Sequence, residues 1–271
     1  MTASEQQPTG PVLRAVVLLA QQPSGIGAIV DVLLPEASAA IGDLPLNEFS
    51  INVNEVSVTF ELGSGPLAAR EFDYAVSQSL LRDRVQAAAA SHRGYLTLSA
   101  QVGDDVFRAA NVLSTITATY ADHDNGLAVW LPDADLATTD VIYAGEVDRR
   151  PAHAWVNPMA APPDATTSPA HTPGAQVLGG PEVQLRTSAL DPASAYKELR
   201  SAVAGLLETR TLPAPGLTLT IAGQPHVLTP ATSQIGMGDV LDVVPSGAPA
   251  PQVQAAAEKP KRKGWFGLGR G

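Results

Sequence analysis

Two stretches in which strand-like and helix-like patterns alternate, separated by a proline-rich segment, constrain the fold of this chain most strongly. In residues 12–150, short β-branched and apolar runs alternate with segments whose apolar residues recur every three or four positions. Residues 181–247 show the same alternation on a smaller scale. Alternation of this kind predicts an α/β protein of the α+β type, built in two parts.

The first stretch predicts the element order β-α-β-β-α-β, with a helix and a strand added at its end. A Gly-Ser-Gly turn at residues 63–65 is expected to join two strands as a hairpin. This order matches a ferredoxin-like split β-α-β core, enlarged by the added helix and strand. The expected strands are residues 12–20, 52–62, 66–72, 95–102 and 127–131, with a further edge strand at 141–147, and the expected helices are residues 26–34, 74–92 and 105–120.

The remaining chain is expected to hold one small domain between two linkers. Residues 151–180 contain six prolines among many Ala, Thr and Ser residues, which predicts an extended linker. Residues 181–247 predict a small β-α-β-β-β unit, in which Asp191 and Pro192 open the helix as cap and first residue. Residues 248–271 predict a flexible linker and a basic, aromatic tail.

Charge is unevenly distributed along the chain. The net charge is −10, but five of the 17 basic residues lie in the last 13 positions, which leaves 12 basic against 27 acidic residues in the body, a net −15. An acidic body with 5% aromatic residues predicts neither a broad cationic face nor a stacking platform, so no nucleic-acid partner is expected. The absence of cysteine excludes disulfides, thiolate metal sites and a cysteine nucleophile.

The first residues predict the location of the protein. Residues 1–10 are polar and carry Glu5 in place of a basic start, and the apolar run at 15–20 is too short for a signal sequence or a membrane span. We therefore expect a cytoplasmic protein. The basic tail adds the hypothesis of a peripheral position at the inner membrane surface.

Histidines supply the one catalytic hypothesis. None of the five lies three or four residues from another, so no helical metal pair is predicted. His171 falls in the predicted linker and is expected to be solvated. His92, at a helix end, is a candidate general base beside Asp104 or Asp105. The structural interpretation of His92, in which its cation suits the helix dipole, is the favoured one.

Motifs for cofactors are incomplete. Gly25 and Gly27 lie between a strand and a helix, where a phosphate would bind. Val30 stands at the third glycine of the dinucleotide pattern, and no P-loop lysine follows. No Gly-x-Ser-x-Gly nucleophile elbow occurs. We expect no cofactor and no metal, and an enzyme is the less favoured class.

Residues 90–99, Ala-Ser-His-Arg-Gly-Tyr-Leu-Thr-Leu-Ser, form a helix end that runs into an apolar strand. This segment resembles a bacterial family of domains of unknown function, DUF4261, whose members have a His-Lys-Ala-His-like stretch at that place. The strands at 15–19 and 127–130 are similar too, and the resemblance spans residues 12–245 without the linker. His92 matches the first histidine, but Tyr95 replaces the second. The resemblance implies an α/β fold and a bacterial origin, with no assigned reaction.

The tail has the most unusual composition in the chain. A basic run beside large apolar side chains is typical of segments that contact an anionic membrane surface. The same tail could instead dock on the acidic body, bind a groove of an unknown protein partner, or only keep the chain soluble. The residues concerned are Lys259, Lys261, Arg262, Lys263, Trp265, Phe266, Leu268 and Arg270.

Together these patterns predict a non-catalytic interaction or adaptor module whose tail contacts an anionic surface or a partner. The alternative is an enzyme or a small-ligand-binding protein, with its site near His92 or between the two domains. The patterns leave the oligomeric state and the identity of any partner or ligand open.

Overall fold

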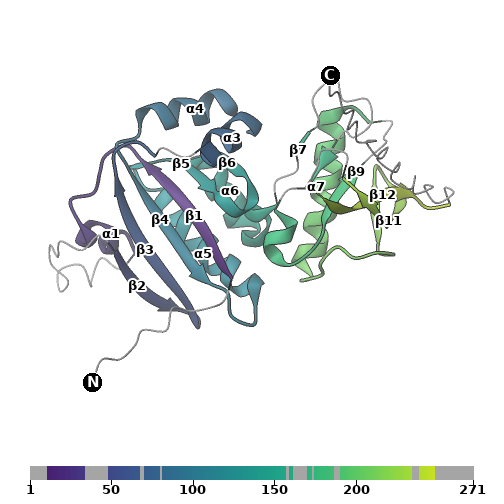
Figure 1. Cartoon of the computed structure of the whole chain (residues 1–271), viewed down its shortest axis with the longest axis horizontal. Helices are drawn as coiled ribbons and strands as arrows, with labels where there is room; N and C mark the ends of the chain where they lie inside the picture. The colour runs from purple at the N-terminus through teal and green to yellow at the C-terminus, as the bar shows by residue number, and fades with distance from the viewer. Residues whose placement is uncertain are drawn as a thin grey trace, which may run out of the picture.

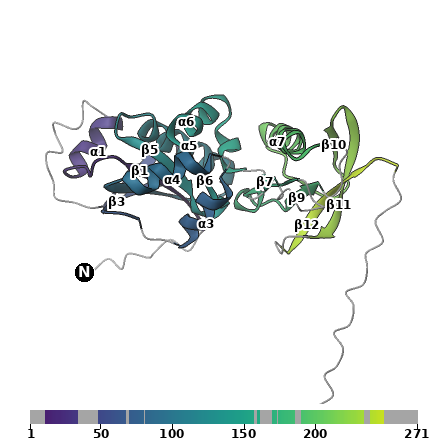
Figure 2. The same cartoon turned by 90° about the horizontal axis from the view of Figure 1, so that it is seen from above.

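The computed structural model describes residues 11–33, 48–67, 70–79, 81–156, 159–160, 170–172, 174–185, 190–233 and 238–247. Over these residues the chain forms two six-stranded sheets with helices packed against them, which confirms the predicted α+β class. The first sheet belongs to an N-terminal unit that ends at residue 149, and the second to a C-terminal unit that begins at residue 159. The two units lie side by side (Figures 1 and 2).

The first sheet has the strand order β2-β3-β4-β1-β5-β6, and all its neighbouring strands are antiparallel. The predicted ferredoxin-like order would place β1 between β3 and β4, but here β4 lies between β3 and β1. The β3–β4 pairing brings Tyr95 over Gly63, where an added Cβ would come within 2.1 Å of the ring. The strands are β1 (Val12–Leu19), β2 (Glu48–Val53), β3 (Val56–Ser64), β4 (Gly94–Gln101), β5 (Gly126–Leu131) and β6 (Leu136–Thr139).

Helices cover the two faces of this sheet unequally. On one face, alternate residues of β1, β3, β4 and β5 pack against α5, with α1 and α6 beside it. On the other face, α3 and α4 cover only the part formed by β1, β5 and β6. The helices of this unit are α1 (Ile26–Leu33), α3 (Arg70–Gln78), α4 (Arg82–Ser91), α5 (Val106–Ala121) and α6 (Asp140–Arg149), with the short turn η1 (Pro132–Ala134).

The second sheet has the order β10-β11-β12-β9-β8-β7. Its parallel pair, β9 and β12, is connected through α7, and the β-α-β-β-β order predicted for 181–247 is present. The Asp191 carboxylate accepts a hydrogen bond from the Ser194 N–H (3.1 Å), as expected of a helix cap. The elements are β7 (Met159–Ala160), β8 (Ala170–His171), η3 (Ala175–Leu178), β9 (Glu182–Leu185), α7 (Pro192–Glu208), β10 (Thr218–Ile221), β11 (Gln224–Thr232) and β12 (Asp239–Pro245).

The predicted hairpin turn lies in the wrong place. Asn54 and Glu55 both have positive φ, 49° and 67°, and form the two-residue turn between β2 and β3. The expected strand 52–62 therefore contains the turn, and residues 63–65 only end β3. The break in alternation between Val53 and Val56 is this turn.

Two helical segments also differ from the prediction. The described residues of the stretch 66–92 form two helices, α3 and α4, and none of them is in a strand. Residues 141–147, predicted as an edge strand, belong to α6. Tyr143 and Val147 are both buried, and their spacing of four residues is the helical period that places them on one face.

The predicted linker 151–180 is wrong over much of its length. The turn η2 (Pro151–Trp155) brings Trp155 into the core, where its side chain is fully buried. The indole Nε1–H donates a hydrogen bond to Ser114 Oγ on α5 (2.8 Å). Strands β7 and β8 and the turn η3 then complete the second sheet and its surroundings. The proline-rich composition hid these short elements because each has only two to five residues.

Candidate functional site

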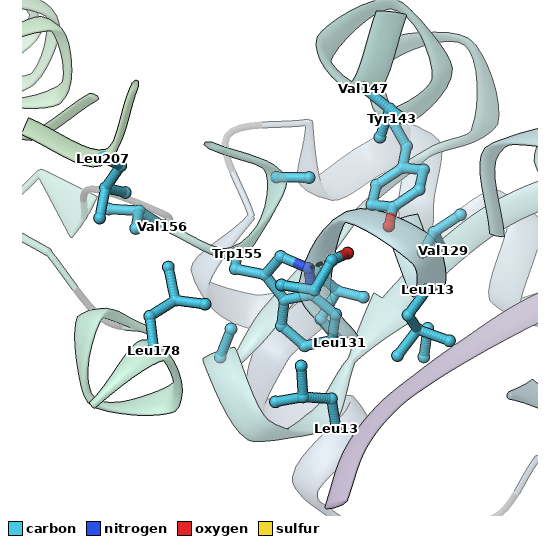
Figure 3. Packing of buried hydrophobic residues seen from close by; sticks show 14 of the residues in the cluster. Leu13, Leu113, Val129, Leu131, Tyr143, Val147, Trp155, Val156, Leu178 and Leu207 are labelled. Carbon is cyan, nitrogen blue, oxygen red and sulfur yellow. Dashed lines mark hydrogen bonds between the residues drawn. The ribbon is translucent and has the colours of Figure 1, made fainter. Parts of the chain in front are cut away.

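The two units are joined by a continuous apolar core. Trp155 and Val156 lie between Leu13 and Leu131 of the first unit and Leu178 and Leu207 of the second (Figure 3). We call the boundary between the two units the seam. Three ion pairs cross it: Glu146–Arg200, Arg150–Glu208 and Asp105–Arg210. Because their side chains are partly solvated, each pair contributes at most about 1 kcal/mol, and the apolar contacts dominate the junction.

A groove of about 310 Å³ opens at this seam, and we call it the seam groove. One wall is the connection between α3 and α4, the opposite wall is α6, and α7 and the end of η2 close it from the second unit. The residues that line it are mostly apolar: Ser79, Leu81, Leu136, Ala137, Thr138, Ile142, Tyr143, Glu146, Ala154, Val156, Tyr196 and Arg200.

The floor of the seam groove is an edge strand. β6 is the last strand of the first sheet and pairs only with β5 among the described residues. Leu136, Ala137 and Thr138 of β6 line the groove. An edge strand presents backbone N–H and C=O groups that no neighbouring strand satisfies. The groove therefore combines apolar walls with an edge strand of which Leu136 is partly exposed, while Ala137 and Thr138 are buried.

One of the three large apolar side chains that are exposed among the described residues lines this groove. Ile142 lines it and is 47% exposed, while Val141, 70% exposed, is its neighbour on α6 but is not a lining residue. Tyr74, 49% exposed, is on α3, which packs against β6. An exposed apolar group beside a concave surface is typical of binding sites.

Two polar groups mark the end of the groove at α7. Arg200 holds Glu146 across the seam, with Nη2 2.6 Å from Oε2. Burial raises the pKa of Tyr196, so its hydroxyl stays protonated at neutral pH. These side chains can orient a bound group by hydrogen bonding.

His92 has a structural role in this fold. Its side chain is 3% exposed, and both ring nitrogens have backbone partners. Nε2 accepts a hydrogen bond from the Leu67 N–H (2.7 Å), and Nδ1 lies 2.6 Å from the Ala89 carbonyl oxygen, to which it donates. These two contacts fix one neutral tautomer and leave no ring nitrogen for a substrate.

The predicted pairing of His92 with Asp104 or Asp105 is wrong. His92 precedes β4 and the aspartates follow it, so an extended strand of roughly 24 Å separates them. Asp105 instead caps α5, accepting a hydrogen bond from the Arg108 N–H (3.0 Å). That hydrogen bond, together with the Arg210 charge, lowers the pKa of Asp105.

The tail residues predicted to bind a surface or partner lie outside the described residues. They are Lys259, Lys261, Arg262, Lys263, Trp265, Phe266, Leu268 and Arg270.

A row of buried polar side chains in the second sheet was missed by the sequence analysis. His171, Gln184 and Asp242 are opposite one another on β8, β9 and β12, and all are buried. Gln184 Nε2 donates a hydrogen bond to Asp242 Oδ1. His171, predicted to be solvated, is 2% exposed, and neither ring nitrogen has a hydrogen-bond partner among the described residues. Burial lowers its pKa.

Glu182, two residues before Gln184, is a buried carboxyl group. Its Oε1 accepts hydrogen bonds from the N–H groups of Gly174 (3.0 Å) and Gln176 (3.2 Å) at the start of η3. Burial nevertheless raises the pKa of Glu182 to about 7. The alternation of Glu182 and Gln184 with Val183 and Leu185 was the available signal for this polar face. Within the described ranges, no three His, Asp or Glu side chains gather as a metal site would require.

Comparisons with protein-family models, curated proteins and solved structures give no match for this chain. The resemblance to the DUF4261 family therefore stays a prediction. In the part of the chain that the structure describes, no helix has the length and apolar character needed to cross a membrane.

Proposed function

We propose that this chain is a non-catalytic interaction module of a bacterial cell, which holds an apolar segment of a partner protein in the seam groove. The basic tail, residues 259–271, tethers the module to the anionic inner surface of the membrane. The observation that carries the proposal is the groove itself, which is lined by the edge strand β6 and by the apolar side chains of Ile142 and Leu81.

An extended peptide suits this geometry. Its backbone would pair with β6 as an added strand, and alternate side chains would enter the groove. Burial of one large apolar side chain contributes about 1.5–3 kcal/mol. Two such side chains contribute about 3–6 kcal/mol, so after the costs of association only weak binding, in the millimolar range at best, remains, which suits a reversible adaptor.

The tail supports a second, weak contact. Each basic residue near an anionic lipid surface contributes about 1 kcal/mol, so five contribute about 5 kcal/mol at most. That corresponds to sub-millimolar, reversible binding, strengthened by insertion of the apolar side chains. Tail and groove together would bring a partner to the membrane surface.

The test uses short apolar peptides in extended form and the full chain with two matched variants. Ile142→Asp places a charge inside the groove, and Val141→Asp places the same charge on the neighbouring, more exposed position outside it. We expect Ile142→Asp to weaken peptide binding at least tenfold and Val141→Asp to leave it unchanged. Equal affinities for all three chains would contradict the proposal.

A second candidate function is the binding of a small apolar ligand at the same place. A volume of about 310 Å³ is at the lower end of the range of small-molecule pockets, roughly 300–1,000 Å³. N-methylation of the peptide backbone separates the two candidates, because it removes strand pairing and keeps the side chains. Loss of binding after N-methylation supports the peptide-binding module, and unchanged binding supports the small-ligand site.

A further inference from the structure

We propose that residues 265–268 of the tail, Trp-Phe-Gly-Leu, occupy the seam groove of the same molecule. This inference rests on the proposed function and adds a regulation to it. While the tail is in the groove, the groove is closed to partners and the tail is withheld from the membrane. An anionic surface that draws the tail away opens the groove.

The chemistry of the two parts is complementary. Trp265, Phe266 and Leu268 are large apolar side chains within four consecutive residues. The groove has mostly apolar walls, and Ile142 on one of them is 47% exposed. Burial of the tail's apolar group in the groove removes both apolar surfaces from water.

Charge favours the same arrangement. The tail carries five basic residues and no acidic one, while the rest of the chain has a net charge of −15. In the groove itself Glu146 is paired with Arg200, and α6 also carries Asp140 and Asp148 against Arg149 outside the lining. Opposite charges of this size raise the local concentration of the tail near the body.

The tether is long enough for intramolecular docking. Seventeen residues, 248–264, separate Gly247, which closely follows β12, from Trp265. A segment of this length reaches at most about 56 Å. The groove is lined by Tyr196 and Arg200 of α7, in the same unit as β12. A tether of this kind gives an effective concentration of order millimolar.

The experiment measures the tryptophan fluorescence of Trp265 in the full chain. Trp130 and Trp155 are buried and provide a constant background, which a Trp265→Phe version of each chain allows one to subtract. The compared chains are the native protein, Ile142→Asp, and Val141→Asp as control. Leu136→Thr is a second groove variant, with a β-branched residue that suits the strand, in case Ile142→Asp perturbs folding.

We expect native Trp265 to show a blue-shifted emission and protection from acrylamide, independent of protein concentration. Ile142→Asp and Leu136→Thr shift the emission to that of exposed tryptophan, and Val141→Asp does not. Exposed Trp265 in the native chain, or equal spectra in all variants, would overturn the inference. Protection that appears only at high protein concentration would also overturn it, because the occupant is then the tail of a second copy.

Vesicles of phosphatidylglycerol separate this inference from the proposed function. If the tail contacts anionic membranes, Trp265 enters the lipid in all four chains, whatever its position before mixing. If the tail docks in the groove of its own chain (cis docking), the groove and the lipid compete for it. The groove variants then reach half-saturation at a lower lipid concentration than the native chain. Identical lipid titrations for native and groove variants count against cis docking and leave the membrane contact intact.

Discussion

Arg200 on α7 and Glu146 on α6 form a two-pronged ion pair across the seam, with Nη2–Oε2 and Nη1–Oε1 distances of 2.6 and 3.2 Å. The pair connects the two units at the rim of the seam groove. Its side chains are 32% and 27% exposed, so water screens the attraction.

We expect a double-mutant cycle of Glu146→Ala and Arg200→Ala to give a coupling energy of about 1 kcal/mol, which falls in 1 M NaCl. Urea denaturation of the four chains measures it. A coupling energy above about 3 kcal/mol would show instead that the pair behaves as a buried one.

Trp155 is the residue whose loss should damage the junction most. Trp155→Ala removes a fully buried side chain and is expected to cost about 3–5 kcal/mol of unfolding free energy. Trp155→Phe keeps most of the volume and loses the hydrogen bond to Ser114, at about 1 kcal/mol. Chemical denaturation checks both values. A loss of under 1 kcal/mol for Trp155→Ala would restore the interpretation of residues 151–156 as a linker.

His92 is expected to matter for stability. His92→Ala removes the acceptor of the buried Leu67 N–H, and an orphaned buried donor costs about 1–3 kcal/mol. His92→Gln offers an amide oxygen as a replacement acceptor and should recover part of this loss. Thermal unfolding distinguishes the variants. Wild-type stability in His92→Ala would contradict the structural role.

The raised pKa of Glu182 should make the free energy of unfolding depend on pH. Its pKa is about 7 in the folded protein and near 4.5 in the unfolded chain, so the folded state holds an extra proton between these values. Raising the pH through this window therefore favours unfolding, by about 3 kcal/mol in total. His171, whose pKa is lowered, acts in the opposite direction, so a comparison with a variant is needed.

Glu182→Gln isolates this contribution. The amide oxygen can accept the same two backbone N–H groups, and the amide does not titrate in this range. We expect the variant to gain stability relative to the native chain as the pH rises from 4.5 to 8. Parallel stability curves for the two proteins over this range would show that Glu182 does not titrate there.

Elements with strong local signals were predictable from the sequence. β1 is a contiguous apolar run, and α7 begins at an Asp-Pro pair that caps a clear helical period. Elements with conflicting signals were not. The residues Val-Ile-Tyr near the start of α6 have high β propensity. The segment is nevertheless helical, because a helix places both Tyr143 and Val147 against the core.

Most of the candidate site could not be predicted from the sequence. β6 has only four residues, Leu-Ala-Thr-Thr, and nothing in them indicates an edge strand at a seam. Tyr196 and Arg200 come from a different unit, so only the tertiary structure brings them to Ile142. The prediction that the tail contacts an apolar or anionic surface depends only on its composition, a cluster of Trp, Phe and Leu among basic residues, and it stays a prediction.

The most direct test of the seam groove places a photoreactive leucine analogue at position 142 of the full chain, and at position 141 in a control. After illumination, mass spectrometry identifies the crosslinked segment. The account predicts that position 142 crosslinks to residues 265–268 of the same molecule and that position 141 does so far less. Equal crosslinking from both positions, or none from position 142 to any apolar segment, would contradict the binding role of the groove.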